Sequence, residues 1–247
     1  MSHSRLAGCC GLTLVVLTCC LLVPCLFEIR DGEGWVRSAN SLNRIGLALN
    51  LYHHINGRLP PAVVHAPDGR ALYSWRVLLL PYLEEDALYK EFHLDEPWDS
   101  PHNKPLTEKT PRCYVPALGG DDPPGLTRYQ VFIGPGTAFE RDGLRLTWDD
   151  FPDGLGGTIL AAEAGNPVPW AKPEDLQYDP QKPFPALGGV FGKPVHFLCY
   201  ELWRRPGFVA CFADGSVRFI PSKTDDKTIR GLITRNGGEA VDVTKIE

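Results

Sequence analysis

The chain carries at residues 6–27 the sequence LAGCCGLTLVVLTCCLLVPCLF, which contains no charged residue and is bordered by Arg5 and Glu28. A helix rises about 1.5 Å per residue, so a segment of this length spans the roughly 30 Å hydrocarbon core of a bilayer. We therefore predict a transmembrane anchor within residues 1–30, with residues 6–27 in contact with the lipid bilayer. Residues 31–247 then form one domain that is attached to the membrane by this anchor.

Two other kinds of leader fit this segment less well. A cleaved signal peptide needs a small-x-small cleavage site after a short apolar region, and the sequence VPCLF at 23–27 offers none. A lipoprotein signal needs an apolar region before its cysteine, whereas only five residues precede the local match LAGC at 6–9. Arg5 precedes the apolar segment and Arg30 and Arg37 follow it, so the positive charges do not decide its orientation.

Composition excludes some partners. The net charge of −5 and the absence of any run of Lys and Arg argue against binding to nucleic acid. The 25 glycines and 23 prolines favour turns and short strands over a helical bundle. Beyond the apolar segment only Cys113, Cys199 and Cys211 remain, and they lack the C-x-x-C spacing of a zinc site. We predict no metal and no cofactor, and a disulfide between Cys199 and Cys211 is suggested if the domain lies outside the cytoplasm.

The region after the anchor predicts a long amphipathic helix. Over residues 35–55, Leu42, Ile45, Leu49 and Tyr52 recur every three or four positions and form one apolar face. Asn56-Gly57 is typical of a helix end, with the glycine in a left-handed conformation.

The remaining patterns mix short helices and strands. The best-defined is a hairpin of 208–212 and 216–220 around Asp214-Gly215, which makes Asp214 a turn residue. The other predicted elements are helices over 71–89, with Ser74 as a cap, over 173–176 and over 226–233, strands over 129–133 and 158–163, and a proline-rich connection over 167–185. The predicted fold class is therefore α+β, with the amphipathic helix packed on an antiparallel sheet and long loops between elements.

Candidate binding residues are few. His53 and His54 are adjacent and point to different sides of a helix, so they do not form one metal site. The acidic loop over 92–103 lacks the ligand spacing of a calcium loop, and we expect it to be a structural loop packed by Trp98. In proline-rich loops the aromatic side chains could offer stacking faces to a ligand, or could simply pack in the core; they are Trp98, Trp170, Tyr178 and Trp203.

Several stretches together resemble one bacterial family, called domain of unknown function 1559, whose members look like type IV pilins and pseudopilins. The matching stretches are NSLNRIGLALNLYHHINGRLPP at 40–61, SWRVLLLPYLEEDALYKEFHLDEPWDSPHN at 74–103, GPGTAF at 134–139, VPWAKPEDL at 168–176 and FADGSVRFI at 212–220. The resemblance implies a pilin-like fold, no assigned catalytic residue, a domain outside the cytoplasm, and other pilin-like subunits as partners.

The chain departs from the family pattern at three places. Gly11-Leu12 resembles the prepilin processing site, but Val16 stands where pilins carry an acid that pairs with the amino terminus of a neighbouring subunit. Arg204 stands where the family has a histidine that nine residues separate from Asp-Gly. Ser38 stands where many members have a cysteine, which implies that Cys113 lacks a disulfide partner here.

The sequence therefore predicts a membrane-anchored, pilin-like envelope protein with a structural or interaction role. It contains no G-x-S-x-G, H-E-x-x-H or dinucleotide fingerprint, so we expect no enzyme activity, and a hydrolase with paired carboxylates ranks last. The alternative is an anchored module outside the cytoplasm that binds a solute or a glycan.

Overall fold

The computed structural model describes residues 34–117, 122–140, 146–191, 195–197, 200–202 and 205–238. The predicted anchor over 6–27 and the predicted processing site with Gly11, Leu12 and Val16 lie outside these residues, and both stay predictions. Among the described residues, no helix is both long enough and apolar enough to cross a membrane.

The long helix covers residues 34–56, which confirms the helix predicted over 35–55. Leu42, Ile45 and Leu49 are completely buried, so the predicted apolar face is the face that packs in the core. The helix ends at Gly57, whose φ of 67° is left-handed and whose N–H donates to the His53 carbonyl at 2.8 Å.

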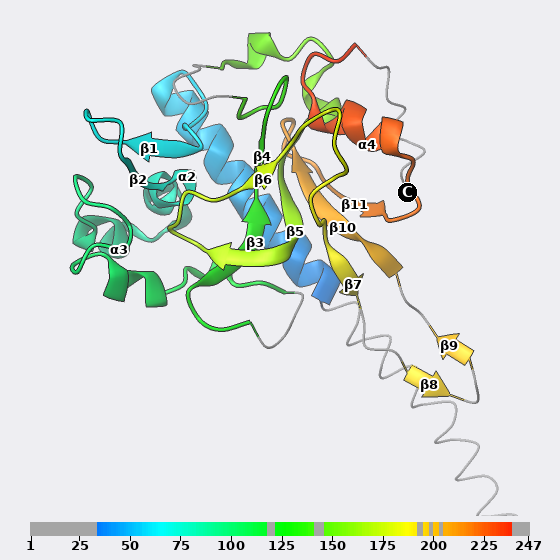
Figure 1. Cartoon of the computed structure of the whole chain (residues 1–247), viewed down its shortest axis with the longest axis horizontal. Coiled ribbons are helices and arrows are strands. Elements are labelled where there is room, and N and C mark those ends of the chain that lie inside the picture. The colour runs from blue at the N-terminus through cyan, green and yellow to red at the C-terminus, as the bar shows by residue number, and fades with distance from the viewer. Residues whose placement is uncertain are drawn as a thin grey trace, which may run out of the picture.

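The main sheet is antiparallel and has the strand order β11-β10-β5-β3, with β7 also paired to β10. Its strands are β3 (Leu126–Gln130), β5 (Ile159–Pro169), β7 (Gly189–Phe191), β10 (Arg205–Phe212) and β11 (Val217–Pro221). Figure 1 shows the long helix crossing the molecule along this sheet, with β10, β11 and α4 (Asp226–Ile233) to its right in the view. The structure is thus α+β with a helix on an antiparallel sheet, as predicted.

The predicted hairpin is confirmed. β10 and β11 pair from Gly207↔Pro221 to Cys211↔Val217, and Gly215 in the turn has a φ of 86°. The Asp214 carboxylate accepts hydrogen bonds from the backbone and hydroxyl of Ser216, so Asp214 acts as a turn residue. The helix predicted over 226–233 is also present as α4, which is capped by the Asp225 side chain.

A second group of elements lies on the other side of the long helix (Figure 1). It contains the strands β1 (Val63–His65) and β2 (Ala71–Ser74), the helices α2 (Trp75–Leu78) and α3 (Asp86–Glu91), and the 3₁₀ helices Leu80–Leu83, Lys104–Glu108 and Arg112–Tyr114. Part of the helix predicted over 71–89 is therefore wrong, because residues 71–74 pair with β1 as a strand. Ser74 then caps α2, as predicted, by accepting from the Arg76 N–H.

Two further predictions need correction. The helix predicted over 173–176 is absent from the described structure; instead β6 (Leu176–Gln177) pairs in parallel with β4 (Phe132–Ile133). The strand predicted over 129–133 is split between β3 and β4 at Val131, because the Val131 N–H turns aside to the Asp175 carboxylate at 3.0 Å. The Asp175 carboxylate thus replaces a neighbouring strand as the hydrogen-bond acceptor for this N–H, and the sequence pattern does not reveal this contact.

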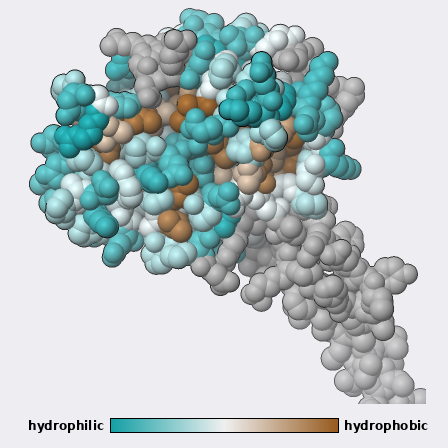
Figure 2. Space-filling view, viewed as in Figure 1, coloured by the Kyte–Doolittle hydropathy of each residue, from teal (hydrophilic) through white to brown (hydrophobic). Residues whose placement is uncertain are grey.

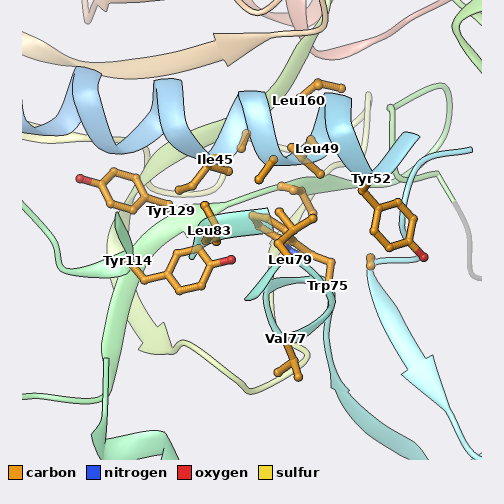
Figure 3. Close-up of a cluster of buried hydrophobic side chains, with 14 of the residues drawn as sticks. Ile45, Leu49, Tyr52, Trp75, Val77, Leu79, Leu83, Tyr114, Tyr129 and Leu160 are labelled. Carbon is orange, nitrogen blue, oxygen red and sulfur yellow. The ribbon is translucent and has the colours of Figure 1, made fainter. Parts of the chain in front are cut away.

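The core is continuous across the long helix. In Figure 3, Ile45, Leu49 and Tyr52 project from the helix toward the layer that holds Trp75, Leu79 and Leu83. On the sheet side the helix approaches β10 closely, since a Cβ added at Gly46 would lie 3.5 Å from the Cys211 Cβ. The long helix is therefore packed between two layers.

The suggested disulfide between Cys199 and Cys211 is wrong, because Cys211 is a free, completely buried cysteine whose position against Gly46 is inside the core. Cys113 is also free and buried. Cys199 lies outside the described residues.

Both buried thiols are expected to be unreactive in the folded protein. Burial raises the pKa of Cys113 and of Cys211 to about 12, so almost no thiolate forms at neutral pH. Iodoacetamide should leave both cysteines unmodified in the native protein and alkylate both in urea, as read by peptide mass spectrometry. Modification of either one under native conditions would show that its part of the core opens.

Candidate interaction surface

The predicted ligand-facing aromatics that the structure describes pack in the core or against it. Trp170 is completely buried, and its Nε1–H donates to the Thr107 carbonyl at 2.8 Å, so it belongs to the core and does not face a ligand. Trp98 is half-buried against the same core, where its backbone N–H donates to the Leu72 carbonyl at 2.7 Å. Trp203 lies outside the described residues. Tyr178 is also buried.

The acidic loop over 92–103 is organised by a buried asparagine. The Asn103 side chain accepts from the His93 N–H at 2.9 Å and donates to the carbonyls of His93 and Pro97. Throughout the part of the chain that the structure describes, no three His, Cys, Asp or Glu side chains are arranged to hold a metal ion. The geometry of this loop therefore accounts for its shape without a ligand.

A buried ion pair joins the two sides of the molecule. The Arg76 guanidinium lies 2.6 Å from the Asp175 carboxylate, and both side chains are fully shielded from solvent. The same carboxylate oxygen accepts from the Trp75 indole and from the Val131 N–H. Burial raises the pKa of Asp175, while the Arg76 charge and these hydrogen bonds counter part of that effect. The pair is enclosed, so it serves packing and not contact with a partner.

A second buried polar cluster fixes the start of the long helix to the sheet. The Ser38 hydroxyl donates to the Glu163 carboxylate on β5 at 2.9 Å, and the Tyr129 hydroxyl lies 3.5 Å from the Ser38 oxygen. Burial and the neighbouring Glu163 charge raise the pKa of Tyr129 to about 12. Ser38 stands where the resemblance implies a cysteine, and in this chain it holds the start of the helix by a hydrogen bond.

The outer face of the long helix carries exposed aliphatic residues. Leu47, Leu51 and Ile55 are 59%, 40% and 67% exposed, and their spacing of four places them one above another on a helix. We call these three residues the helix stripe. The surface drawn in Figure 2 is mostly hydrophilic where it is described, with hydrophobic residues in small separate areas. The regular spacing in sequence could have revealed the stripe.

A groove adjoins the stripe at the C-terminal end of the helix. It has a volume of about 500 Å³ and is lined by Leu47, Asn50, Leu51, His53, His54, Gly57 and Trp148. The His53 ring stacks on Trp148 with ring centroids 4.3 Å apart. Burial, and secondly the charge of His54, lowers the pKa of His53, whose Nε2 atom is buried and has no hydrogen-bond partner.

Trp148 was not among the aromatic candidates chosen from the sequence. It opens the 3₁₀ helix Trp148–Asp150, which is held by a capping box between Thr147 and Asp150. The pattern Thr147-x-x-Asp150 is the sequence signal that could have located this turn. The His53 ring covers part of the Trp148 face, so the groove has an aromatic wall beside Leu47 and Leu51.

Comparison with known proteins finds a family that is similar to part of this chain. Residues 36–118, about a third of the chain, match a family model described as a protein of unknown function, DUF1559. No curated protein and no solved structure matches the chain. The match covers most of the long helix, α2, α3 and the loop held by Asn103, which contain the two longest stretches of the resemblance. Over this segment the chain is therefore similar to the DUF1559 family of proteins of unknown function.

Proposed function

We propose that the protein is a membrane-anchored, pilin-like protein of the bacterial envelope that acts through contacts with other proteins and not by catalysis. Residues 6–27 supply the anchor, and the domain formed by the later residues lies outside the cytoplasm. Other pilin-like subunits are the class of partner that fits this role best.

The helix stripe is the observation that carries this proposal. Leu47, Leu51 and Ile55 lie on a helix whose opposite face is already packed in the core, so the stripe is available for a second contact. Exposed aliphatic residues gathered on one element favour contact with another apolar surface. The long helix begins only seven residues after Phe27, so the stripe lies on the element closest in sequence to the anchor.

In-cell photo-crosslinking tests this proposal on the full chain. A photoreactive phenylalanine at Leu51 should form adducts with protein, whereas the same residue at Lys227, exposed on α4, should not. The chain should also stay with the membrane after alkaline carbonate extraction. Release into the supernatant would contradict the anchor, and equal crosslinking at both positions would contradict a role for the helix stripe.

The alternative function is binding of a solute or a glycan, and the groove between His53 and Trp148 is the observation that favours it. Its aromatic wall and volume of about 500 Å³ suit a small ligand. This function predicts that a glycan or solute protects Trp148 from oxidation by N-bromosuccinimide. It also predicts no protein adducts at Leu51, so the crosslinking experiment separates the two functions.

A further inference from the structure

The chain contains two Asn-Gly pairs, which the structure places in different surroundings. They are Asn56-Gly57 at the end of the long helix and Asn236-Gly237 after α4. A side-chain amide is lost most readily when glycine follows the asparagine, because glycine has no Cβ to hinder its backbone nitrogen and adopts a wide range of conformations. The local structure of each pair therefore decides which asparagine reacts in the folded protein.

Hydrogen bonds hold the first pair. The Gly57 N–H donates to the His53 carbonyl at 2.8 Å. The Asn56 side-chain nitrogen donates to the Tyr52 carbonyl at 2.8 Å and to the Tyr82 hydroxyl at 3.2 Å. Loss of the amide requires that the Gly57 nitrogen give up its proton and that the Asn56 side chain turn toward it, and both steps break these bonds. The helix end thus protects Asn56.

The second pair carries no such bonds. Asn236 and Gly237 are exposed and lie in a bend after the end of α4 at Ile233. Within the described part of the chain, neither the Asn236 side chain nor the Gly237 N–H makes a hydrogen bond. The Asn236 side-chain oxygen packs against Gly136, where an added Cβ would lie 2.8 Å from it. The amide is therefore positioned by packing alone, and no acceptor among the described residues holds the Gly237 proton.

The residues on either side of the second pair are fixed. The Arg235 N–H donates to the Gly136 carbonyl at 2.8 Å, and the Arg235 carbonyl accepts from the Asp153 N–H at 3.1 Å. Beyond the pair, the Gly238 N–H donates to both oxygens of the Asp153 carboxylate at 3.2 Å. The pair is therefore an exposed bend within a held segment and not part of a frayed end.

We propose that Asn236 is a site of spontaneous deamidation in the folded protein. The Gly237 nitrogen forms a bond with Cγ of Asn236 and loses its proton to solvent base, while the side-chain amide takes up a proton and leaves as ammonia. Water then opens the succinimide ring at one of its two carbonyls, which gives aspartate or isoaspartate. The reaction needs only water and base, and it is independent of the proposed function.

The products change the held segment in two ways. Either acid adds a negative charge two residues before the Gly238 N–H that the Asp153 carboxylate binds. Isoaspartate also routes the main chain through the side chain, which lengthens the backbone between the hydrogen bonds of Arg235 and Gly238 by one carbon atom. Both changes act against the contact between Asp153 and Gly238, because like charges repel and because the spacing of the bonds is altered.

Timed incubation of the full chain tests the site. Samples are held at mildly alkaline pH in native buffer or in guanidinium chloride and are then digested with trypsin for mass spectrometry. The peptide of residues 236–245 has no other Asn or Gln, so the mass increase from amide to acid reports Asn236 alone. In native buffer Asn236 should lose its amide several-fold faster than Asn56, which fragment ions separate from Asn50 in the peptide of residues 45–58. In guanidinium chloride the two Asn-Gly pairs should react at similar rates.

A variant of the glycine checks the route. G237A should slow the loss at Asn236 several-fold in native buffer and leave Asn56 unchanged, because the added methyl group hinders the attacking nitrogen. Loss at Asn236 as slow as at Asn56 in the native protein would overturn the proposal, and an unchanged rate in G237A would overturn the succinimide route. A difference between the two pairs that persists in guanidinium chloride would overturn the protection of Asn56 by the helix end, because neighbouring residues and not the fold would then set the rates.

Discussion

Replacing Arg76 by Met will lower the free energy of unfolding by about 3–5 kcal/mol, the cost of leaving one member of a buried ion pair without its partner. Asp175 is completely buried, and Arg76 is its cationic partner at 2.6 Å. The variant also removes donors to the Tyr129 carbonyl and to the Ser74 hydroxyl. Equilibrium unfolding in urea, followed by tryptophan fluorescence, measures the loss.

The pH dependence of this loss has a defined sign. Burial raises the pKa of Asp175, and removing the Arg76 charge raises it further. A carboxyl group with a raised pKa in the folded state favours folding when it is protonated, and this contribution is lost as pH rises through its folded pKa. The deficit of R76M should therefore be larger at neutral pH than at mildly acidic pH.

Two variants control for effects other than the ion pair. Arg112 is exposed, so R112M should change stability by at most about 0.5 kcal/mol. R76M/D175L removes both charges and should lose less than R76M alone, because no unpaired carboxylate remains. A double variant as unstable as R76M would show that the loss comes from packing and not from the stranded charge.

Replacing Trp170 by Ala will lower the free energy of unfolding by about 3–5 kcal/mol, as for other large-to-small substitutions in cores. Its ring lies 5.9 Å from Tyr114 and 6.0 Å from Phe92, measured between ring centroids, and it is completely buried. The substitution also removes the donor to the Thr107 carbonyl. Urea unfolding again measures the change, with the slope of the transition checked for a two-state process.

Trp98 provides the matched comparison. It is only half-buried, so W98A should cost clearly less than W170A. If Trp170 served a ligand and not the core, W170A would leave stability nearly unchanged and alter binding alone. Equal stability losses in the two variants would contradict the difference in burial.

Local sequence patterns correctly predicted the helices and turns that are determined by residues close together in the chain. The period of Leu42, Ile45 and Leu49 predicted the long helix, and Asp214-Gly215 predicted the hairpin of β10 and β11. These features depend on helix periodicity and turn geometry, which act between close neighbours in the chain.

Long-range polar contacts account for most of what the sequence did not predict. Val131 leaves the strand because its N–H donates to Asp175, which is 44 residues away. The helix start is held by Ser38 and Glu163, which are 125 residues apart. No local sequence pattern identifies the partners in either of these two contacts, so the contacts are visible only in the folded chain. For the surface, the choice of Trp170 as a ligand-facing residue failed because a loop tryptophan can equally fill the core.

The burial of the long helix between two layers has a mechanical consequence. A pull transmitted through residue 34 acts along a helix that is fixed to β5 at Ser38 and packed against β10 at Gly46. The load is therefore applied in shear, parallel to β10, and is shared by many contacts before any one of them breaks. Such loading in shear resists tension along the helix axis, which is the direction in which the proposed anchor would pull.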